Sequence, residues 1–181
     1  PPPVFIEPLA VSRLAGLVPN WETVVDVLTL ADGSLVPEVS TGLPYLLIPV
    51  KDAAALAAVE LPGGGKQMLT DIGRSKDTHP LKLHSSLYFY HRDTLGDDAA
   101  GARFSARMFC FEQGVWLEDA ATGSAAGCLA AHLAQRSPAE LPASIEQGVQ
   151  MGRPSALQID ATAPAEGESQ DAWRVSVGGR V

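Results

Sequence analysis

The chain has 181 residues, of which 46% are hydrophobic, and its formal net charge at pH 7 is −8. This length and composition suffice for one globular domain with a hydrophobic core and argue against disorder. The negative charge argues against nucleic-acid binding through phosphates, which requires clustered lysine and arginine. We also expect no membrane span and no signal peptide, because the sequence lacks an apolar run of 18 residues and a basic start followed by one.

The cysteine and histidine patterns give no sign of a metal site. Cys110 and Cys128 are the only cysteines, and none of the four histidines follows a metal-ligand spacing. Two isolated cysteines predict reduced, buried thiols in a cytoplasmic protein, although the sequence leaves a disulfide between them open. His132 lies in an apolar segment, so packing in or beside the core is expected of it rather than catalysis.

The first half of the chain predicts short elements separated by proline and glycine. Proline-rich segments are stiff and extended, apolar residues at helical spacing favour helices, and apolar runs ending at turn residues favour strands. In order, these patterns predict a linker over residues 1–8, a helix over 9–18, a strand over 22–30, a strand region over 39–50 and helices over 52–61 and 65–75.

The second half of the chain predicts strands on both sides of one apolar helix. The strands are expected over residues 85–93, 102–111, 156–163 and 171–181. About six strands and three or four helices without strict βαβ alternation favour an α+β fold with a mixed or antiparallel sheet. The segment SAAGCLAAHLAQ, which starts at Ser124, is apolar around its whole circumference and is expected to be buried on all sides. We therefore predict a curved β-sheet wrapped around a central helix.

A polar cluster, LEDAATGS, stands directly before this helix. The first turn of a helix leaves about four backbone N–H groups without partners and carries a partial positive charge. One interpretation is a simple helix cap, supplied by Asp119, Thr122 or Ser124. The other is a cradle for an anion or carboxylate, with Gly123 leaving room above the helix. Three possible caps and two adjacent carboxylates favour the cradle, because a carboxylate held in a cleft can act as an acid, a base or an orienting group.

The segment FCFEQGVWLEDAATGSAAGCLAAHL resembles the signature of the phenazine-biosynthesis (PhzF-like) isomerase family. The matching positions are Arg107, Phe109, Gly114, Glu118, Asp119, Ala121, Thr122, Gly123, Ser124 and Ala125. VSTGLPYLLIPV is similar to the family's Ser-Thr-Gly-x-Pro strand, and QGVQMGRPS to its Gln-Gly and Gly-Arg-Pro-Ser segment. The resemblance covers nearly the whole chain and is most specific at the Glu-Asp motif.

This resemblance implies a fold like that of diaminopimelate epimerase, with two similar lobes and an active site between them. Family members use no metal and no organic cofactor, move a proton on a small carboxylate substrate, and are usually dimers. The resemblance assigns catalytic roles to Asp119 and Ser124. It places Thr122, Gly123 and Ala125 at the substrate carboxylate, while the acid/base glutamate and its supporting histidine belong to the first lobe.

The sequence departs from the family pattern in two ways. Ala120 stands where proline is usual, and no segment resembles the first lobe. We therefore expect residues 1–181 to be a single domain, the C-terminal lobe of a two-lobed enzyme, and we expect the chain alone to be inactive. Two alternatives stay open: a non-catalytic lobe that binds small carboxylates or mediates dimerisation, and a thiol-type racemase of the same fold.

Overall fold

The computed structural model describes residues 1–16, 18–30, 35–61, 86–98, 101–112 and 115–180. Its strands are β1 (Val4–Ala10), β2 (Leu35–Ser40), β3 (Pro44–Pro49), β4 (Ser86–Asp98), β5 (Gly101–Glu112), β6 (Val115–Asp119), β7 (Ala143–Gln147), β8 (Ser155–Thr162) and β9 (Arg174–Arg180). Its helices are α1 (Trp21–Val24), α2 (Ala53–Ala57) and α4 (Gly123–Arg136), with 3-10 turns η1 (Val11–Gly16), η2 (Pro138–Glu140), η3 (Val149–Met151) and η4 (Gln170–Ala172).

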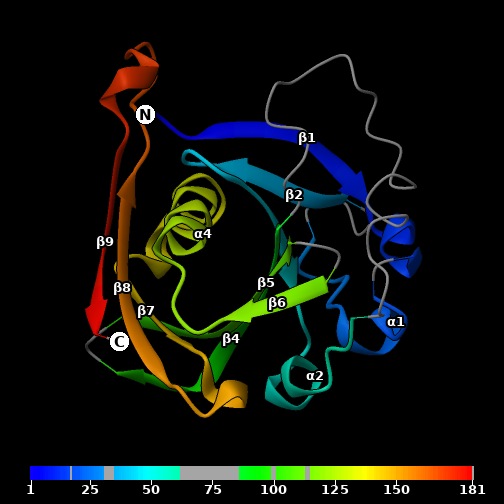
Figure 1. Ribbon diagram of the computed structural model, residues 1–181. Helices are drawn as coiled ribbons and strands as arrows, with labels where there is room; N and C mark the ends of the chain where they lie inside the picture. The colour runs from blue at the N-terminus through cyan, green and yellow to red at the C-terminus, as the bar shows by residue number, and fades with distance from the viewer. Residues whose placement is uncertain (17, 31–34, 62–85, 99–100, 113–114, 181) are drawn as a thin grey trace.

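All the described strands belong to one mixed sheet. The order is β1-β2-β3-β4-β5-β7-β8-β9, and β6 pairs with β5 beside this path. β3 pairs with β4 and β5 pairs with β7 in parallel, whereas the other neighbours are antiparallel. The predicted α+β class and mixed sheet are confirmed. Figure 1 shows the sheet bending so that its two edge strands, β1 and β9, approach each other.

Helix α4 lies within the curve of this sheet and packs against β8, β9, β2 and β3 (Figure 1). Its residues 125–131 are all buried. Because about 3.6 residues make one turn, this stretch covers every direction around the helix axis. The alanine and glycine side chains that dominate the segment are small, so the strands can come close to the helix from several sides.

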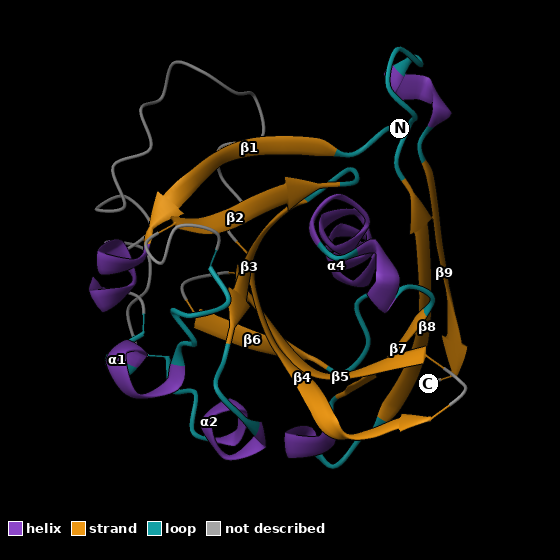
Figure 2. Ribbon diagram, turned by 180° about the vertical axis from the view of Figure 1, so that it is seen from behind, coloured by secondary structure: helices purple, strands orange, loops and turns teal. Residues whose placement is uncertain are grey.

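The hydrophobic core has two parts, one on each face of the sheet. Tyr45 and Leu47 of β3 pack in the cluster around α4, whereas Leu46 and Ile48 pack in a second cluster with η1, α1 and α2. Successive side chains of a strand point to opposite faces, so an uninterrupted apolar run is what a strand covered on both faces requires. Figure 2 shows α1 and α2 on the side of β3 and β4 away from α4.

Three predictions at the N-terminal half need correction. Residues 1–8 are not a linker throughout, because β1 starts at Val4 and pairs with β2 despite Pro8. Among the described residues of the predicted 9–18 helix, only 11–16 are helical, as the 3-10 turn η1. The predicted 22–30 strand begins as the short helix α1, and Val25 forms a single bridge to Val50.

The valine pair at this position explains the wrong strand assignment. Val24 and Val25 are both buried although they are adjacent, which regular alternation in a half-buried strand does not permit. The chain changes there from helix to extended backbone, at Val25. The predicted strands over 85–93, 102–111, 156–163 and 171–181 correspond to β4, β5, β8 and β9, and the short 52–61 helix to α2. The predicted 65–75 helix lies outside the described residues.

A pocket of about 480 Å³ lies at the C-terminal end of α4, far along the helix from Asp119. His132 and Arg136 of α4 line it together with Tyr90 and Phe104 of the sheet. Burial, with a smaller contribution from the nearby Arg136 charge, lowers the pKa of His132 to about 4. Among the described residues, no helix is long and apolar enough to cross a membrane.

The partly buried imidazole of His132 makes the stability of the fold depend on pH. The unfolded chain binds a proton at this histidine near pH 6.5 and the folded chain only near pH 4, so the free energy of unfolding falls as the pH is lowered through this window. At about 1.4 kcal/mol per unit of pKa, the fall is on the order of 2 to 3 kcal/mol. Denaturant titrations from pH 7 to pH 4 should show this slope reduced in His132→Gln, and an unchanged slope would contradict the assignment.

Candidate functional site

Strand β6 separates the two carboxylates of the Glu-Asp motif. Glu118 and Asp119 are consecutive residues in the extended strand, so their side chains leave on opposite faces of the sheet. Glu118 is partly buried, whereas Asp119 is exposed. The two acids therefore meet different environments and have different tasks.

Glu118 belongs to the architecture around α2. The Arg107 guanidinium donates from Nε to Oε1 of Glu118 at 2.8 Å and from Nη2 to Oε2 at 2.9 Å. Its Nη1 also donates to the backbone carbonyls of Leu56, Ala57 and Val59 at the end of α2, at 3.1 to 3.2 Å. A bidentate arginine pair that also satisfies helix-end carbonyls is a strong contact, so Glu118 fixes structure and is not available to a ligand.

Asp119 is held at the start of α4. The Thr122 hydroxyl donates to Asp119 Oδ2 at 2.6 Å, and the Gln147 side-chain amide donates to the Asp119 carbonyl at 2.7 Å and to Thr122 Oγ1 at 3.1 Å. The Tyr88 hydroxyl in turn donates to Gln147 Oε1 at 3.3 Å. Gln147 is fully buried, so this network sets the turn from β6 into α4 rigidly.

A glycine allows the segment that carries Gln147 to approach this turn. Gly148 has φ +84°, in the left-handed region, and a Cβ there would lie 2.8 Å from the Ala120 carbonyl oxygen and still closer to the Arg153 carbonyl oxygen. A side chain at this position would push the β7 end away from Ala120. The Gln-Gly pair thus combines a buried hydrogen-bond donor with a close backbone contact.

The first turn of α4 has donor groups without partners. Thr122 occupies the N-cap position, but its side chain makes no capping hydrogen bond; its hydroxyl donates to Asp119 and accepts from the Gln147 amide instead. Within the described part of the chain, no acceptor is found for the backbone N–H groups of Gly123, Ser124 and Ala125. The simple-cap interpretation therefore fails for all three candidates, and the helix presents its amides and partial positive charge outward.

The five predicted site residues come together at this helix end. Asp119 and Gly123 are exposed and Ser124 is half-buried, so these three are accessible. Thr122 and Ala125 are buried, so Thr122 supports Asp119 through its hydroxyl, and Ala125 offers only its backbone amide. Figure 1 shows β6 running into the loop that opens this end of α4. Donors and one carboxylate side by side suit a ligand with both a negative group and a hydrogen-bond donor.

Neither thiol has the surroundings of an activated cysteine. Both cysteines are free. Cys128 is completely buried one turn deeper in α4, and burial raises the pKa of its thiol. Burial, together with the Glu112 and Asp119 charges, also raises the pKa of Cys110. Raised pKa values disfavour the thiolate that a nucleophilic or basic cysteine needs, so the geometry gives no support to a thiol-type racemase. Among the described residues, no group of three histidines, cysteines or acids could hold a metal ion.

Sequence comparison with known families gives a match over most of the chain. The family described as phenazine biosynthesis-like protein (PhzC-PhzF) matches residues 20–181. The chain belongs to this family. Gly114, one of the matching motif positions, lies outside the described residues, whereas the Arg107–Glu118 pair and the Asp119–Ala125 segment are described.

Curated relatives of this phenazine biosynthesis-like chain include named isomerases. It is 46% identical over 99 residues to trans-2,3-dihydro-3-hydroxyanthranilate isomerase of Pseudomonas fluorescens, a match covering 53% of the chain and 34% of the relative. It is 32% identical over 126 residues to an uncharacterized isomerase of Mesorhizobium japonicum, covering 68% of the chain and 38% of the relative. The matches thus span only about a third of these relatives.

Solved structures with the same fold extend over almost the entire chain. A PhzF-family phenazine biosynthesis protein of Bacillus anthracis has a TM-score of 0.68 at 19% identity, covering 97% of this chain and 54% of that one. A predicted epimerase of Pseudomonas aeruginosa has a TM-score of 0.61 at 26% identity, covering 99% of this chain and 52% of that one. The chain corresponds to about half of each neighbour.

Sequence reasoning missed the residues that support the motif. The sequence pattern shows Gln147 only as part of a Gln-Gly segment, and Tyr88 and Tyr45 only as residues of expected strands. The signal that could have identified Gln147 is a glutamine directly before a glycine, at a position of the buried type. A polar side chain there needs hydrogen-bond partners inside the fold. Arg107 and Glu118 were matched to the family, but the motif alone did not indicate that they bind each other.

The division of tasks between the two acids predicts different stability effects. Glu118→Gln should lower the free energy of unfolding by on the order of 2 kcal/mol, because it leaves the mostly buried Arg107 guanidinium without its carboxylate. Asp119→Asn should cost less than about 1 kcal/mol, because this side chain is exposed. Denaturant titrations of both variants check this contrast, which equal losses would contradict.

Proposed function

We propose that this phenazine biosynthesis-like chain supplies one half of the active site of a cofactor-independent isomerase that moves a proton on a small carboxylate substrate. The observation that carries the proposal is the row of three amides at the start of α4 for which the described residues provide no acceptor, with the Asp119 carboxylate held beside it by the Thr122 hydroxyl. The names of the curated relatives support the reaction class.

The chemistry of the helix end suits an amino or hydroxy carboxylate. The amides of Gly123, Ser124 and Ala125 and the Ser124 hydroxyl would hold the substrate carboxylate, where the helix dipole favours negative charge. Asp119 would accept a hydrogen bond from the neighbouring amino or hydroxyl group and so orient the carbon that exchanges its proton. A dihydro-hydroxyanthranilate, the substrate in the names of the relatives, has groups of both kinds.

The other half of the site would come from a first lobe. In this proposal, residues 1–181 are the C-terminal lobe of a diaminopimelate-epimerase-like fold, and the acid/base group stands on the first lobe across a cleft. Asp119 and Gly123 are exposed in this chain. Catalysis of proton transfer requires that water be displaced from the reacting groups, so a second lobe would be needed to cover them. A homodimer in the complete protein stays a prediction from the family resemblance.

One alternative function is non-catalytic and does not include isomerisation. A lobe that binds small carboxylates through the α4 amides, or that contributes to a dimer interface, would use the same exposed helix end. The identity of the named relatives favours the isomerase, and the two functions separate by turnover once a first lobe is supplied.

Ligand titration tests the site directly. Titration of the chain with 3-hydroxyanthranilate, followed by calorimetry, should give binding that Asp119→Ala and Ser124→Ala each weaken at least about tenfold, the equivalent of about 1.4 kcal/mol. Asp160→Ala and Ser176→Ala serve as matched controls, because both residues are exposed and pair with each other across β8 and β9. Unchanged affinity in both site variants would reduce the polar cluster to a structural turn.

Turnover tests the division into lobes. The chain alone is expected to leave trans-2,3-dihydro-3-hydroxyanthranilate unchanged, because the proposed acid/base group is not on it. The measurement is deuterium incorporation into carbon in heavy water, followed by mass spectrometry. Isomerisation by the isolated 181-residue chain, above a Ser124→Ala control, would overturn the proposal of an active site shared between two lobes.

A further inference from the structure

Two hydroxyl groups, one from the connection after β2 and one from the start of β3, contact the first turn of α4. The Tyr45 hydroxyl lies 2.7 Å from Ser124 Oγ. The Thr41 hydroxyl donates to the Ser124 backbone carbonyl at 3.2 Å and lies 3.5 Å from Cys128 Sγ. Both therefore come from the VSTGLPY stretch, 79 and 83 residues before Ser124 in the chain. Tyr45 thus holds the side chain of Ser124, and Thr41 holds its backbone.

We propose that Tyr45 is a positioning residue that sets the Ser124 hydroxyl as a donor toward the substrate carboxylate, an inference that rests on the proposed function of this helix end. Ser124 would touch the ligand, and Tyr45 would act only through Ser124. Thr41 supports the same arrangement from the other side, because its bond to the Ser124 carbonyl holds the backbone to which the hydroxyl is attached.

The direction of the Tyr45–Ser124 hydrogen bond follows from what a carboxylate needs. A carboxylate is only an acceptor, so Ser124 must donate its hydrogen to the ligand and can then only accept from Tyr45. Burial raises the pKa of Tyr45, so the phenol stays protonated and able to donate. Two hydroxyls in sequence polarise each other, which strengthens the outer bond to the ligand.

The surroundings of Tyr45 leave its hydroxyl with few other partners. Tyr45 is 3% exposed and packs in the core cluster around α4. In the described part of the chain, Ser124 is the only residue with which its hydroxyl forms a hydrogen bond. A serine in the first turn of a helix that lacks such a partner can instead turn its hydroxyl to a nearby backbone group. The Tyr45 hydroxyl prevents this competing arrangement.

The experiment compares Tyr45→Phe in two backgrounds by the same 3-hydroxyanthranilate titration. The substitution removes one oxygen, and it should weaken binding about fivefold in the unsubstituted chain but less than about twofold when Ser124 is alanine. Tyr90→Phe is the matched control, since Tyr90 lines the pocket at the other end of α4. Thermal melts establish that each variant is folded. If Tyr45→Phe does not fold, Thr41→Val, which should also weaken binding, carries the test.

A second readout needs no ligand. Proton coupling constants of the Ser124 β-hydrogens should report one side-chain rotamer in the unsubstituted chain and averaging in Tyr45→Phe. An unchanged rotamer, or an equal loss of affinity with and without the Ser124 hydroxyl, would overturn the positioning role while leaving the proposed function intact. Absence of any binding to the unsubstituted chain would overturn the proposed function and this inference with it.

Discussion

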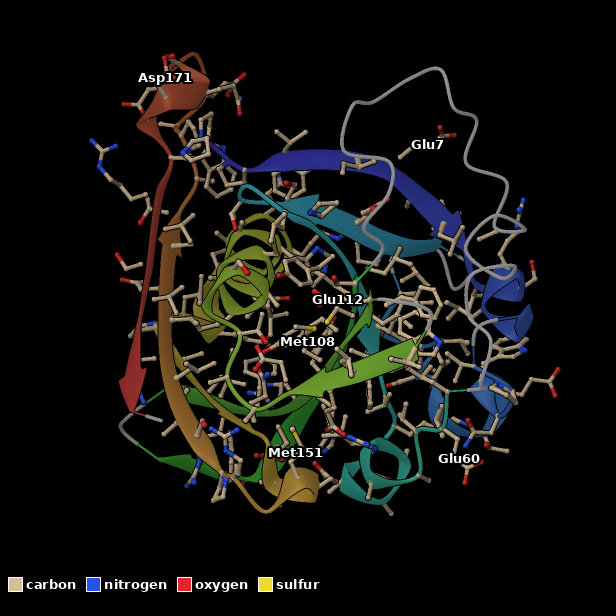
Figure 3. All side chains as sticks on the ribbon, viewed as in Figure 1. Glu7, Glu60, Met108, Glu112, Met151 and Asp171 are labelled. Atoms are coloured by element: carbon tan, nitrogen blue, oxygen red, sulfur yellow. The ribbon has the colours of Figure 1, made fainter. Side chains whose placement is uncertain are left out.

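The amide groups at the start of α4 are the constraint on which the site depends. Helix α4 is buried from residue 125 to 131, so water does not reach its first N–H groups from the sides of the helix. Those groups need partners at the one end that is open. The hydroxyls of Thr122 and Ser124 bond to other side chains, Thr122 to Asp119 and Gln147 and Ser124 to Tyr45. The proposed function supplies the missing acceptor as a substrate carboxylate. Figure 3 shows the dense side-chain packing around this helix.

The site is rigid because each polar group in it is held by a residue from a different strand. Asp119 ends β6, Gln147 ends β7, and Tyr88 lies in β4. Each of these hydrogen bonds depends on the relative position of two strands, so the sheet sets the geometry of the turn. In the same way, Arg107 of β5 joins β6 to the end of α2. The Asp119 carboxylate is therefore positioned by contacts between strands as well as by its own loop.

The features that sequence reasoning predicted are those written in local patterns. The apolar segment of α4 and the long strands β4 and β5 have strong periodicity, and Asp119 and Ser124 stand in one short motif. The features it missed depend on contacts between distant segments, such as Gln147 with Thr122 and Tyr45 with Ser124, because only the strand order brings these residues together. Neither β6 nor β7 is among the strands that the sequence predicts, and β6 ends within the polar cluster before α4. The proline-rich start indicates a linker over residues 1–8, yet β1 begins at Val4 and an edge strand tolerates proline.

The alternation along β6 limits how the length of this segment can change. Inserting or deleting one residue between Val115 and Glu118 would exchange the two faces. Glu118 would then leave the face on which Arg107 lies, and Asp119 would leave the face on which it meets Thr122. A change of two residues would restore the phase. Length variation in this hairpin is thus restricted by parity, a constraint that acts on the backbone even where no individual side chain there is required.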